Sequence, residues 1–313
     1  MKRFFKSILL LLSILFVVNV ILDFGFSRWL NHCPKLMYRP WNCIVHDSIN
    51  ADLLVMGSSR AWVQYDPHIM DSLLSINSYN LGLNGSHVRR QIVNYKVYHH
   101  YQKKQPLLLI INFDYFGNWG KDGGEGGFER EQFFPYMVNP YMRNLIKQQE
   151  PFSKWELYLP MFRYYRQGVM NLFEEKYNEA CWYKGYYWGK PQEWDGTKLA
   201  KMKTVSFEPL QDAVEQFDVF LSELQKDDVQ VVFVTSPIYF GVTEITENIQ
   251  DFYSFRKHFS EKYNIQVLDY LYDSLCYDTA FFYNATHLNK TGAELFTTKL
   301  CNDINSLGLL RKN

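Results

Sequence analysis

Four short runs of apolar residues, none of which alternates cleanly with polar residues, constrain the fold of this chain most strongly. Apolar runs of this length suit strands that are buried on both faces, as in a parallel sheet covered by helices. A fifth run, at residues 265–268, is weaker. The four stronger runs occupy residues 52–56, 78–81, 107–112 and 229–235.

One stretch between these runs has a clear helical repeat. From Leu210 to Leu224, apolar residues three and four positions apart form one stripe along a helix, and Ser206 is a candidate N-cap. A strand run follows directly, and this helix-to-strand order predicts a doubly wound, flavodoxin-like α/β fold with a parallel sheet. Such folds bind ligands outside the carboxyl ends of their strands, so functional residues are expected there.

Four polar or glycine-rich blocks lie at a predicted strand end or in a loop before a helix. They are residues 57–60 (GSSR), 80–86 (NLGLNGS), 112–114 (NFD) and 284–289 (NATHLN). Their order and spacing resemble the SGNH, or GDSL-like, hydrolase superfamily, whose blocks read GDS, N-x-G-x-x-G, GxND and D-x-x-H. The resemblance covers roughly residues 51–115 and 229–300, and it implies an SGNH-type fold.

The resemblance also implies catalytic roles. Ser59 falls on the nucleophile position, and His287 on that of the base which takes the serine proton. Gly85 matches the second-block glycine, whose backbone N–H would join that of Ser59 in an oxyanion hole. Each residue alone also has a structural interpretation, because Ser58 and Ser59 suit a turn and a lone histidine is more often structural.

The fourth block departs from the family pattern. Asn284 stands three residues before His287, where the family has an aspartate. An asparagine orients an imidazole but does not offset the charge of an imidazolium. A serine dyad, or a carboxylate supplied by Asp278 or Asp114, remains an alternative.

The third block departs as well. Counting back from Asp114 places Phe113 where the family has the asparagine of its oxyanion hole, and Asn112 is one residue off. In a strand that shift reverses the face of the side chain. Asn112 is therefore expected to donate to the oxyanion only if the strand has ended or bulges there.

The N-terminus predicts a membrane-spanning helix. Lys2, Arg3 and Lys6 precede an apolar run at residues 7–22, and Trp29 suits the membrane interface. We expect an uncleaved anchor at residues 1–30 rather than a cleaved signal peptide, because no pair of small residues has the spacing that a signal peptidase needs. Either interpretation makes residues 31–313 an extracytoplasmic domain, periplasmic or at the cell surface.

Residues 115–205 form a predicted insertion rich in aromatic residues. Most of these rings are expected to form the core of a small helical cap. A second hypothesis is that the rings within residues 182–194 line a groove for a glycan, because aromatic faces offer broad apolar contact beside polar edges. Exposed rings would favour the groove, and buried rings would favour the core.

Composition narrows the partners and cofactors. The 33 basic residues balance 33 acidic ones, so no nucleic-acid partner is expected. The five cysteines show no metal-site spacing, and neither a metal nor an organic cofactor is expected. In an oxidising compartment Cys33 and Cys43 would close a short disulfide loop, with free buried thiols as the alternative.

These features together predict a membrane-anchored serine esterase or O-acyltransferase. An exported enzyme of this class meets envelope carbohydrates, so the expected reaction is hydrolysis or transfer of O-acyl esters on a glycan. The alternative is a catalytically weakened SGNH-like protein that binds carbohydrate or serves as a scaffold for a membrane acyltransferase. Asn284 favours the alternative, whereas the presence of both Ser59 and His287 favours the enzyme.

Overall fold

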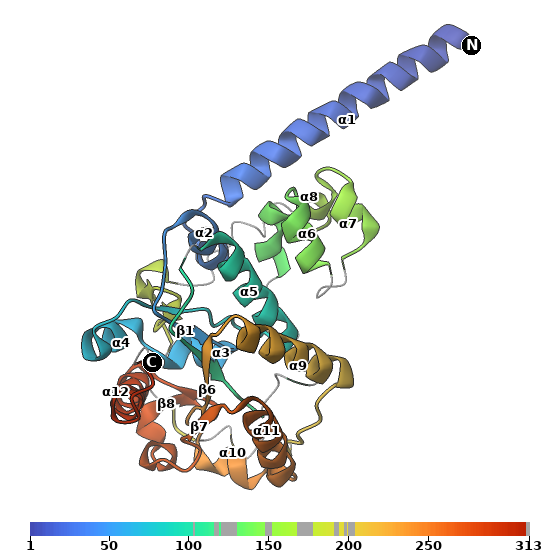
Figure 1. Cartoon of the computed structure of the whole chain (residues 1–313). Helices are drawn as coiled ribbons and strands as arrows, with labels where there is room; N and C mark the ends of the chain where they lie inside the picture. The colour runs from blue at the N-terminus through green and yellow to red at the C-terminus, as the bar shows by residue number, and fades with distance from the viewer. Residues whose placement is uncertain are drawn as a thin grey trace. The chain divides into compact units, whose positions relative to one another are not determined.

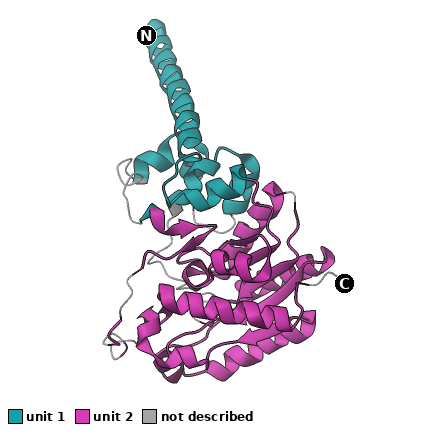
Figure 2. Ribbon diagram, turned by 90° about the vertical axis from the view of Figure 1, so that its left-hand side faces the viewer, with its two compact units in different colours: residues 1–47, 129–179 teal, residues 48–128, 180–313 magenta. Residues whose placement is uncertain are grey.

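The computed structural model describes residues 1–102, 104–115, 119, 130–147, 152–167, 178–190, 194–196, 199 and 204–310. The chain divides into two compact units, coloured separately in Figure 2. Unit 1 comprises residues 1–47 and 129–179, and unit 2 comprises residues 48–128 and 180–313. The sequence analysis placed a boundary at residue 30, whereas unit 1 continues to residue 47. The predicted insertion ran from about residue 115 to 205, whereas residues 180–205 belong to unit 2. Part of that predicted insertion lies outside the described residues.

A five-stranded parallel sheet forms the centre of unit 2 (Figure 1). Its strands lie in the order β2-β1-β3-β6-β7, which is the flavodoxin-like order for five successive parallel strands. The predicted doubly wound fold is therefore confirmed, and each of the five apolar runs overlaps a strand. The strands are β1 (Leu53–Met56), β2 (Ser78–Asn80), β3 (Leu108–Asn112), β6 (Gln230–Thr235) and β7 (Gln266–Asp269).

Helices cover both faces of this sheet. On one face α12 packs against α3 and α4, and on the other α9 packs against α5 and α11. The three strands in the middle of the order, β1, β3 and β6, are buried almost throughout because both faces are covered. The helices of unit 2 are α3 (Ser59–Gln64), α4 (Pro67–Leu74), α5 (Val88–Tyr101), α9 (Gln211–Lys226), α10 (Phe240–Glu244), α11 (Ile249–Tyr263) and α12 (Lys290–Ser306).

The predicted helix at residues 210–224 is α9, and its apolar stripe is buried. Its N-cap is Leu210, without a side-chain cap, rather than Ser206. The Ser206 hydroxyl instead donates to Glu208, before the helix begins. The serine lies too far upstream to reach the first free backbone N–H groups, so the cap prediction was wrong.

Two short antiparallel hairpins complete unit 2. One pairs β4 (Trp182–Tyr183) with β5 (Tyr186–Tyr187). The turn of this hairpin is bonded to β2, because the Asn80 N–H donates to the Lys184 carbonyl. The other pairs β8 (Phe282–Asn284) with β9 (His287–Leu288), directly before α12. Both hairpins contact α3, so they bring residues that are distant in the sequence to the segment around Ser59.

Unit 1 contains the long N-terminal helix α1 (Lys2–Leu30) and short helices. At 29 residues α1 is about 44 Å long, enough to cross a bilayer by length and composition. Its apolar side chains are largely exposed up to Leu22, whereas Ser27 and Leu30 are fully buried. The short helices are α2 (Arg39–His46), η1 (Arg130–Tyr136), α6 (Pro140–Ile146), α7 (Lys154–Tyr158) and α8 (Phe162–Gln167).

A buried polar cluster ties the last turns of α1 to α8 inside unit 1. One guanidinium nitrogen of Arg163 lies 2.9 Å from Asp23 Oδ2 and 3.0 Å from Ser27 Oγ. The Met161 N–H donates to Asp23 Oδ1, and the Tyr164 hydroxyl lies 2.8 Å from Ser27 Oγ. Both charges of the pair are buried, and a buried charge is costly without its partner. The end of α1 is thus part of the core of unit 1.

All five cysteines are free thiols in this structure. Cys33 and Cys43 therefore match the second interpretation, free thiols, and do not form the disulfide loop. Burial raises the pKa of the Cys43 thiol to about 12, which keeps it protonated and unreactive at neutral pH.

Candidate active site

Ser59 lies in a sharp turn between the end of β1 and the start of α3. It is the first residue of α3, so its backbone N–H is among the groups left without a partner at a helix start. Gly57 makes the turn tight: a Cβ there would lie 2.6 Å from Ala61 Cβ and 2.9 Å from Asn112 Cβ. Any side chain at residue 57 would push the turn away from β3. Because Gly57 has no side chain, the turn can stay close to β3 and place Ser59 at the carboxyl edge of the sheet.

The β8–β9 hairpin places His287 against this serine. His287 Nε2 lies 2.8 Å from Ser59 Oγ. The other ring nitrogen, Nδ1, lies 2.9 Å from Asn284 Oδ1 and 2.8 Å from Thr286 Oγ1. The structure thus brings together the three residues that the sequence analysis selected as catalytic, in the order nucleophile, base and orienting group.

The orientation of the Asn284 amide fixes the tautomer of His287. The backbone N–H of Thr286 donates to Asn284 Oδ1 over 3.0 Å, and the Thr286 hydroxyl also donates to it. Because both of these Thr286 groups donate, the Asn284 atom that they contact must be the amide oxygen, and the same atom faces His287. Nδ1 then carries the proton, and Nε2 is left free to accept a proton from the Ser59 hydroxyl. This is the tautomer that a general base needs.

His287 has no carboxylate partner in the described part of the chain. Asp278 caps the short 3₁₀ helix η6 (Thr279–Phe281) by accepting from the Ala280 N–H. Asp114 forms a buried ion pair with Arg60. Neither contacts the imidazole, so the alternative in which one of them replaces the family aspartate is not what the structure shows.

The surroundings of His287 favour its neutral form. Burial is the main reason that its pKa is lowered to about 3, and the positive charges of Arg60 and Lys190 lower it further. The imidazole is therefore an unprotonated base throughout the neutral range. The same environment makes the imidazolium that forms during proton transfer costly, because Asn284 supplies a dipole and no negative charge.

This low pKa predicts an unusual pH dependence. A base with the ordinary histidine pKa of about 6.5 would lose about 30-fold in kcat/KM between pH 8 and pH 5. With a pKa of about 3, His287 stays neutral over that range, so we expect kcat/KM to change less than about threefold. Initial rates with a neutral aryl ester, measured with the folded state checked at each pH, test this. An acid limb centred near pH 6.5 would contradict it.

A buried polar network lies behind the serine. Arg60 Nε donates to Asp114 Oδ2 over 3.0 Å, and the Asn112 amide donates to the same oxygen over 2.6 Å. The Tyr65 hydroxyl in turn donates to Asn112 Oδ1. Burial and the Asp114 charge raise the pKa of Tyr65, which keeps this hydroxyl protonated as a donor. The network fixes α3, and with it Ser59, against the end of β3.

Asn112 and Phe113 face opposite sides of the sheet, as the one-residue shift predicts. Phe113 packs in the core, with its ring 4.7 Å from that of Phe233 and 5.8 Å from that of Phe217. Asn112, the last residue of β3, turns toward α3 and is engaged with Tyr65 and Asp114. That Asn112 donates to an oxyanion stays a prediction.

The second block holds the loop that carries Gly85 against the serine turn. The Asn80 amide donates to the carbonyls of Ala61 and Tyr65, and its oxygen accepts from the Gly82 N–H. Downstream, the Leu83 N–H and the Ser86 hydroxyl both donate to the Gly57 carbonyl. These contacts bring the loop beside the strand end that carries Ser59.

Gly85 itself has a φ of 65°, a backbone conformation that favours glycine. Its place in the loop agrees with the role that the family resemblance implies. The oxyanion hole made of the Ser59 and Gly85 N–H groups stays a prediction.

The aromatic residues within residues 182–194 are largely buried where the structure describes them. Tyr186, Tyr187 and Trp194 expose 1, 3 and 8% of their surface, and Trp182 and Trp188 are half-buried. Burial of these rings favours the first hypothesis, in which they form a core, over a broad glycan groove.

One residue near the site was not selected from the sequence. Lys190 follows the β4–β5 hairpin, and its charge reaches His287. A lone lysine in an aromatic stretch carries no local signal of such a role, because only the fold of the hairpin places it there.

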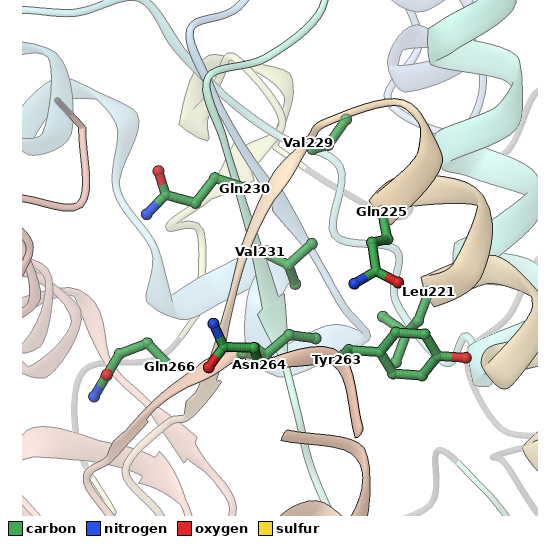
Figure 3. A pocket seen from close by; sticks show the side chains of 9 residues that line it. Leu221, Gln225, Val229, Gln230, Val231, Tyr263, Asn264 and Gln266 are labelled. Carbon is green, nitrogen blue, oxygen red and sulfur yellow. The ribbon is translucent and has the colours of Figure 1, made fainter. Parts of the chain in front are cut away.

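A separate pocket of about 190 Å³ lies at the opposite edge of the sheet (Figure 3). It is lined by residues from the amino ends of β6 and β7 and from the ends of α9 and α11, including Gln225, Val231 and Tyr263. Ser59 follows the carboxyl end of β1 in the same parallel sheet, so this pocket is not part of the site.

Comparison with models of known families gives no match, and no curated protein matches the chain. Among solved structures, the chain is similar to a presumed acylhydrolase from Bacteroides fragilis, with 13% identity over 83% of this chain and 88% of that chain and a TM-score of 0.41. A presumed lipolytic protein of the G-D-S-L family from Desulfitobacterium hafniense has 11% identity over 80% and 97% of the two chains, and a TM-score of 0.40. A presumed platelet activating factor from Streptococcus pneumonia has 11% identity over 96% and 99%, and a TM-score of 0.41.

At these scores the likeness carries no weight for activity, and the class follows from the chain's own geometry. The strand order agrees with the expected SGNH-type fold, and Ser59 pairs with His287 at the carboxyl edge of the sheet. In this arrangement the histidine is oriented by an asparagine.

Proposed function

We propose that this protein is a serine-dependent O-acyl ester hydrolase or O-acyltransferase that acts on an extracytoplasmic carbohydrate from a membrane anchor. The observation that carries the chemistry is the 2.8 Å contact between Ser59 Oγ and His287 Nε2, with Nδ1 held by Asn284. A serine hydroxyl is a weak nucleophile until a base accepts its proton, and a neutral imidazole at hydrogen-bonding distance is such a base.

The proposed reaction runs in two steps. Ser59 Oγ attacks the ester carbonyl while its proton moves to His287 Nε2, and the N–H groups of Ser59 and Gly85 bind the oxyanion. The imidazolium then returns the proton to the leaving sugar oxygen, which leaves an acyl group on Ser59. Water resolves this acyl-enzyme in a hydrolase, and a second sugar hydroxyl resolves it in a transferase.

Two features support the setting that we propose. The exposed apolar part of α1 has the length of a membrane span, and Lys2, Arg3 and Lys6 before it favour a cytoplasmic N-terminus. The catalytic residues then lie outside the cytoplasm, where acylated glycans are ester substrates of the right kind.

Labelling of the full-length protein in detergent with a fluorophosphonate probe tests the serine chemistry. We expect the wild type to be labelled, Ser59→Ala to lose the label and Ser58→Ala to keep it. Ser58 is a matched control because it directly precedes Ser59, and the serine hydroxyl that is hydrogen-bonded to His287 is that of Ser59. Assays with an O-acetylated oligosaccharide, with and without an added acceptor glycan, then separate hydrolysis from transfer.

A second candidate function is a carbohydrate-binding or scaffolding partner of a membrane acyltransferase. The observation that favours it is Asn284, which leaves the imidazolium without a countercharge. Folded wild-type protein that takes no label but retains affinity for an acylated glycan would support this function over catalysis.

A further inference from the structure

Unit 1 exposes large aromatic side chains on two neighbouring short helices, α7 and α8, which pack against each other. Trp155 and Tyr158 are three positions apart and share one face of α7, and Leu159 follows at its C-cap. Tyr165 is exposed on α8. Trp155, Tyr158 and Tyr165 expose 65, 59 and 57% of their surface. We call these three residues and Leu159 the aromatic patch.

Contacts within unit 1 place α8 beside the last third of α1. The Tyr165 hydroxyl lies 3.4 Å from Asn19 Oδ1. Further along α1, the guanidinium of Arg163 contacts both Asp23 and Ser27. Asn19 belongs to the apolar run of α1, so the patch residue Tyr165 reaches into the segment that is long and apolar enough to cross a membrane.

The length of the span sets the depth of these contacts in a bilayer. A hydrocarbon core about 30 Å thick takes about 20 helical residues. Counted from Ser7, the first residue after the cationic Lys6, the outer boundary of this core falls near Phe26. Trp29 then lies in the headgroup layer, where tryptophan is enriched. The helix rises about 10 Å from Asn19 to Phe26, so α8 lies at the depth of the outer leaflet.

We propose that the aromatic patch is a second membrane-contact surface, which lies in the interfacial layer of the outer leaflet beside the span. The proposal rests on the membrane anchor of the proposed function and goes beyond it. The partner is phospholipid, because tryptophan and tyrosine rings are apolar with a polar edge and favour the boundary between headgroups and acyl chains. Lys154, exposed next to Trp155, suits the lipid phosphates.

Photo-crosslinking in vesicles of phosphatidylethanolamine and phosphatidylglycerol tests the contact. Full-length protein carries p-benzoylphenylalanine (Bpa) at one position, and irradiation joins its ketone to a neighbouring C–H bond. We expect phospholipid adducts, detected by mass spectrometry, in Trp155→Bpa and in Tyr158→Bpa. Phe16→Bpa, within the apolar run, reports whether α1 lies in the bilayer. His46→Bpa is an exposed control, stacked on His32 beyond the end of α1, and should give a lower yield.

The positions separate failure of the patch from failure of the anchor. A lipid adduct in Phe16→Bpa without one at Trp155 or Tyr158 would overturn the proposal and leave the anchor intact. An adduct between the patch and a second protein chain would overturn it in the same way. No lipid adduct at any position would mean that α1 is not in the bilayer, and the proposal would fall with the anchor. Fluorophosphonate labelling of Ser59 reports separately on the serine chemistry.

The fluorescence of Trp155 gives an independent test. Trp155→Phe keeps an aromatic side chain, so the difference in emission between the wild type and this variant isolates one indole. In vesicles of lipids with brominated acyl chains, we expect this difference to be lost through quenching, whereas acrylamide in the water should remove little of it. Quenching by acrylamide and not by brominated lipid would place the ring in water and overturn the proposal.

Discussion

Replacing His287 with alanine is expected to lower kcat/KM by about 10⁴-fold, because the Ser59 hydroxyl then has no base at hydrogen-bonding distance. Among the residues that the structure describes, His287 is the side chain that lies at hydrogen-bonding distance from Ser59 Oγ. Steady-state rates with a neutral aryl ester, on variants whose folding is confirmed by circular dichroism, measure the effect.

The double variant gives the sharper test of the same pair. Nucleophile and base act as one unit, so Ser59→Ala, His287→Ala and the combination should lose activity to about the same level. Ser58→Ala should stay within about threefold of the wild type. Losses that multiply in the double variant would mean that the two residues act independently, which the 2.8 Å contact does not allow.

Replacing Asn284 with aspartate is expected to raise kcat/KM at pH 8, by about 10- to 1,000-fold. A carboxylate at this position would contact Nδ1 as the amide oxygen does, at 2.9 Å, and would add a negative charge beside the imidazolium. The upper limit corresponds to about 4 kcal/mol for two charges 4 Å apart at an effective dielectric constant of about 20. The two groups of Thr286 that donate to Asn284 Oδ1 suit a carboxylate as well.

The same substitution changes the pH profile. The added charge raises the pKa of His287 from about 3, so an acid limb should enter the measured range in the aspartate variant. Asn284→Leu, which is similar in size but accepts no hydrogen bond, should lower activity because only the Thr286 hydroxyl then faces Nδ1, and a hydroxyl can donate or accept, so it does not fix the tautomer. If aspartate left both the rate and the profile unchanged, Asn284 would not act on His287 during catalysis.

The residues that could be predicted from the sequence are those whose neighbours along the chain reveal them. The buried strands appear as apolar runs, and Ser59 and His287 stand in short blocks at strand ends. Asn112 and Phe113 were assigned to opposite faces from strand geometry alone, and they lie on opposite faces. Each of these inferences needs only local pattern and the rule that ligands bind at the carboxyl edge of a parallel sheet.

What escaped prediction depends on contacts between distant segments. The pairing of Asp114 with Arg60 joins residues 54 positions apart, and Lys190 reaches the rings around His287 only through the β4–β5 hairpin. The partner of Asp23 is 140 positions away. No local periodicity encodes such pairs, because they arise from how separate segments fold back on one another.

The buried pair of Asp23 and Arg163 also joins the apolar segment of α1 to the folded residues of unit 1. Asp23 and Ser27 belong to the same continuous helix as the apolar segment, so no flexible linker separates a membrane span from the folded residues of unit 1. Cleavage of α1 would leave Arg163 buried without its counterion. With the span in a bilayer, as proposed, the folded residues of unit 1 would begin directly at the membrane surface, and unit 1 would tilt and turn together with the span.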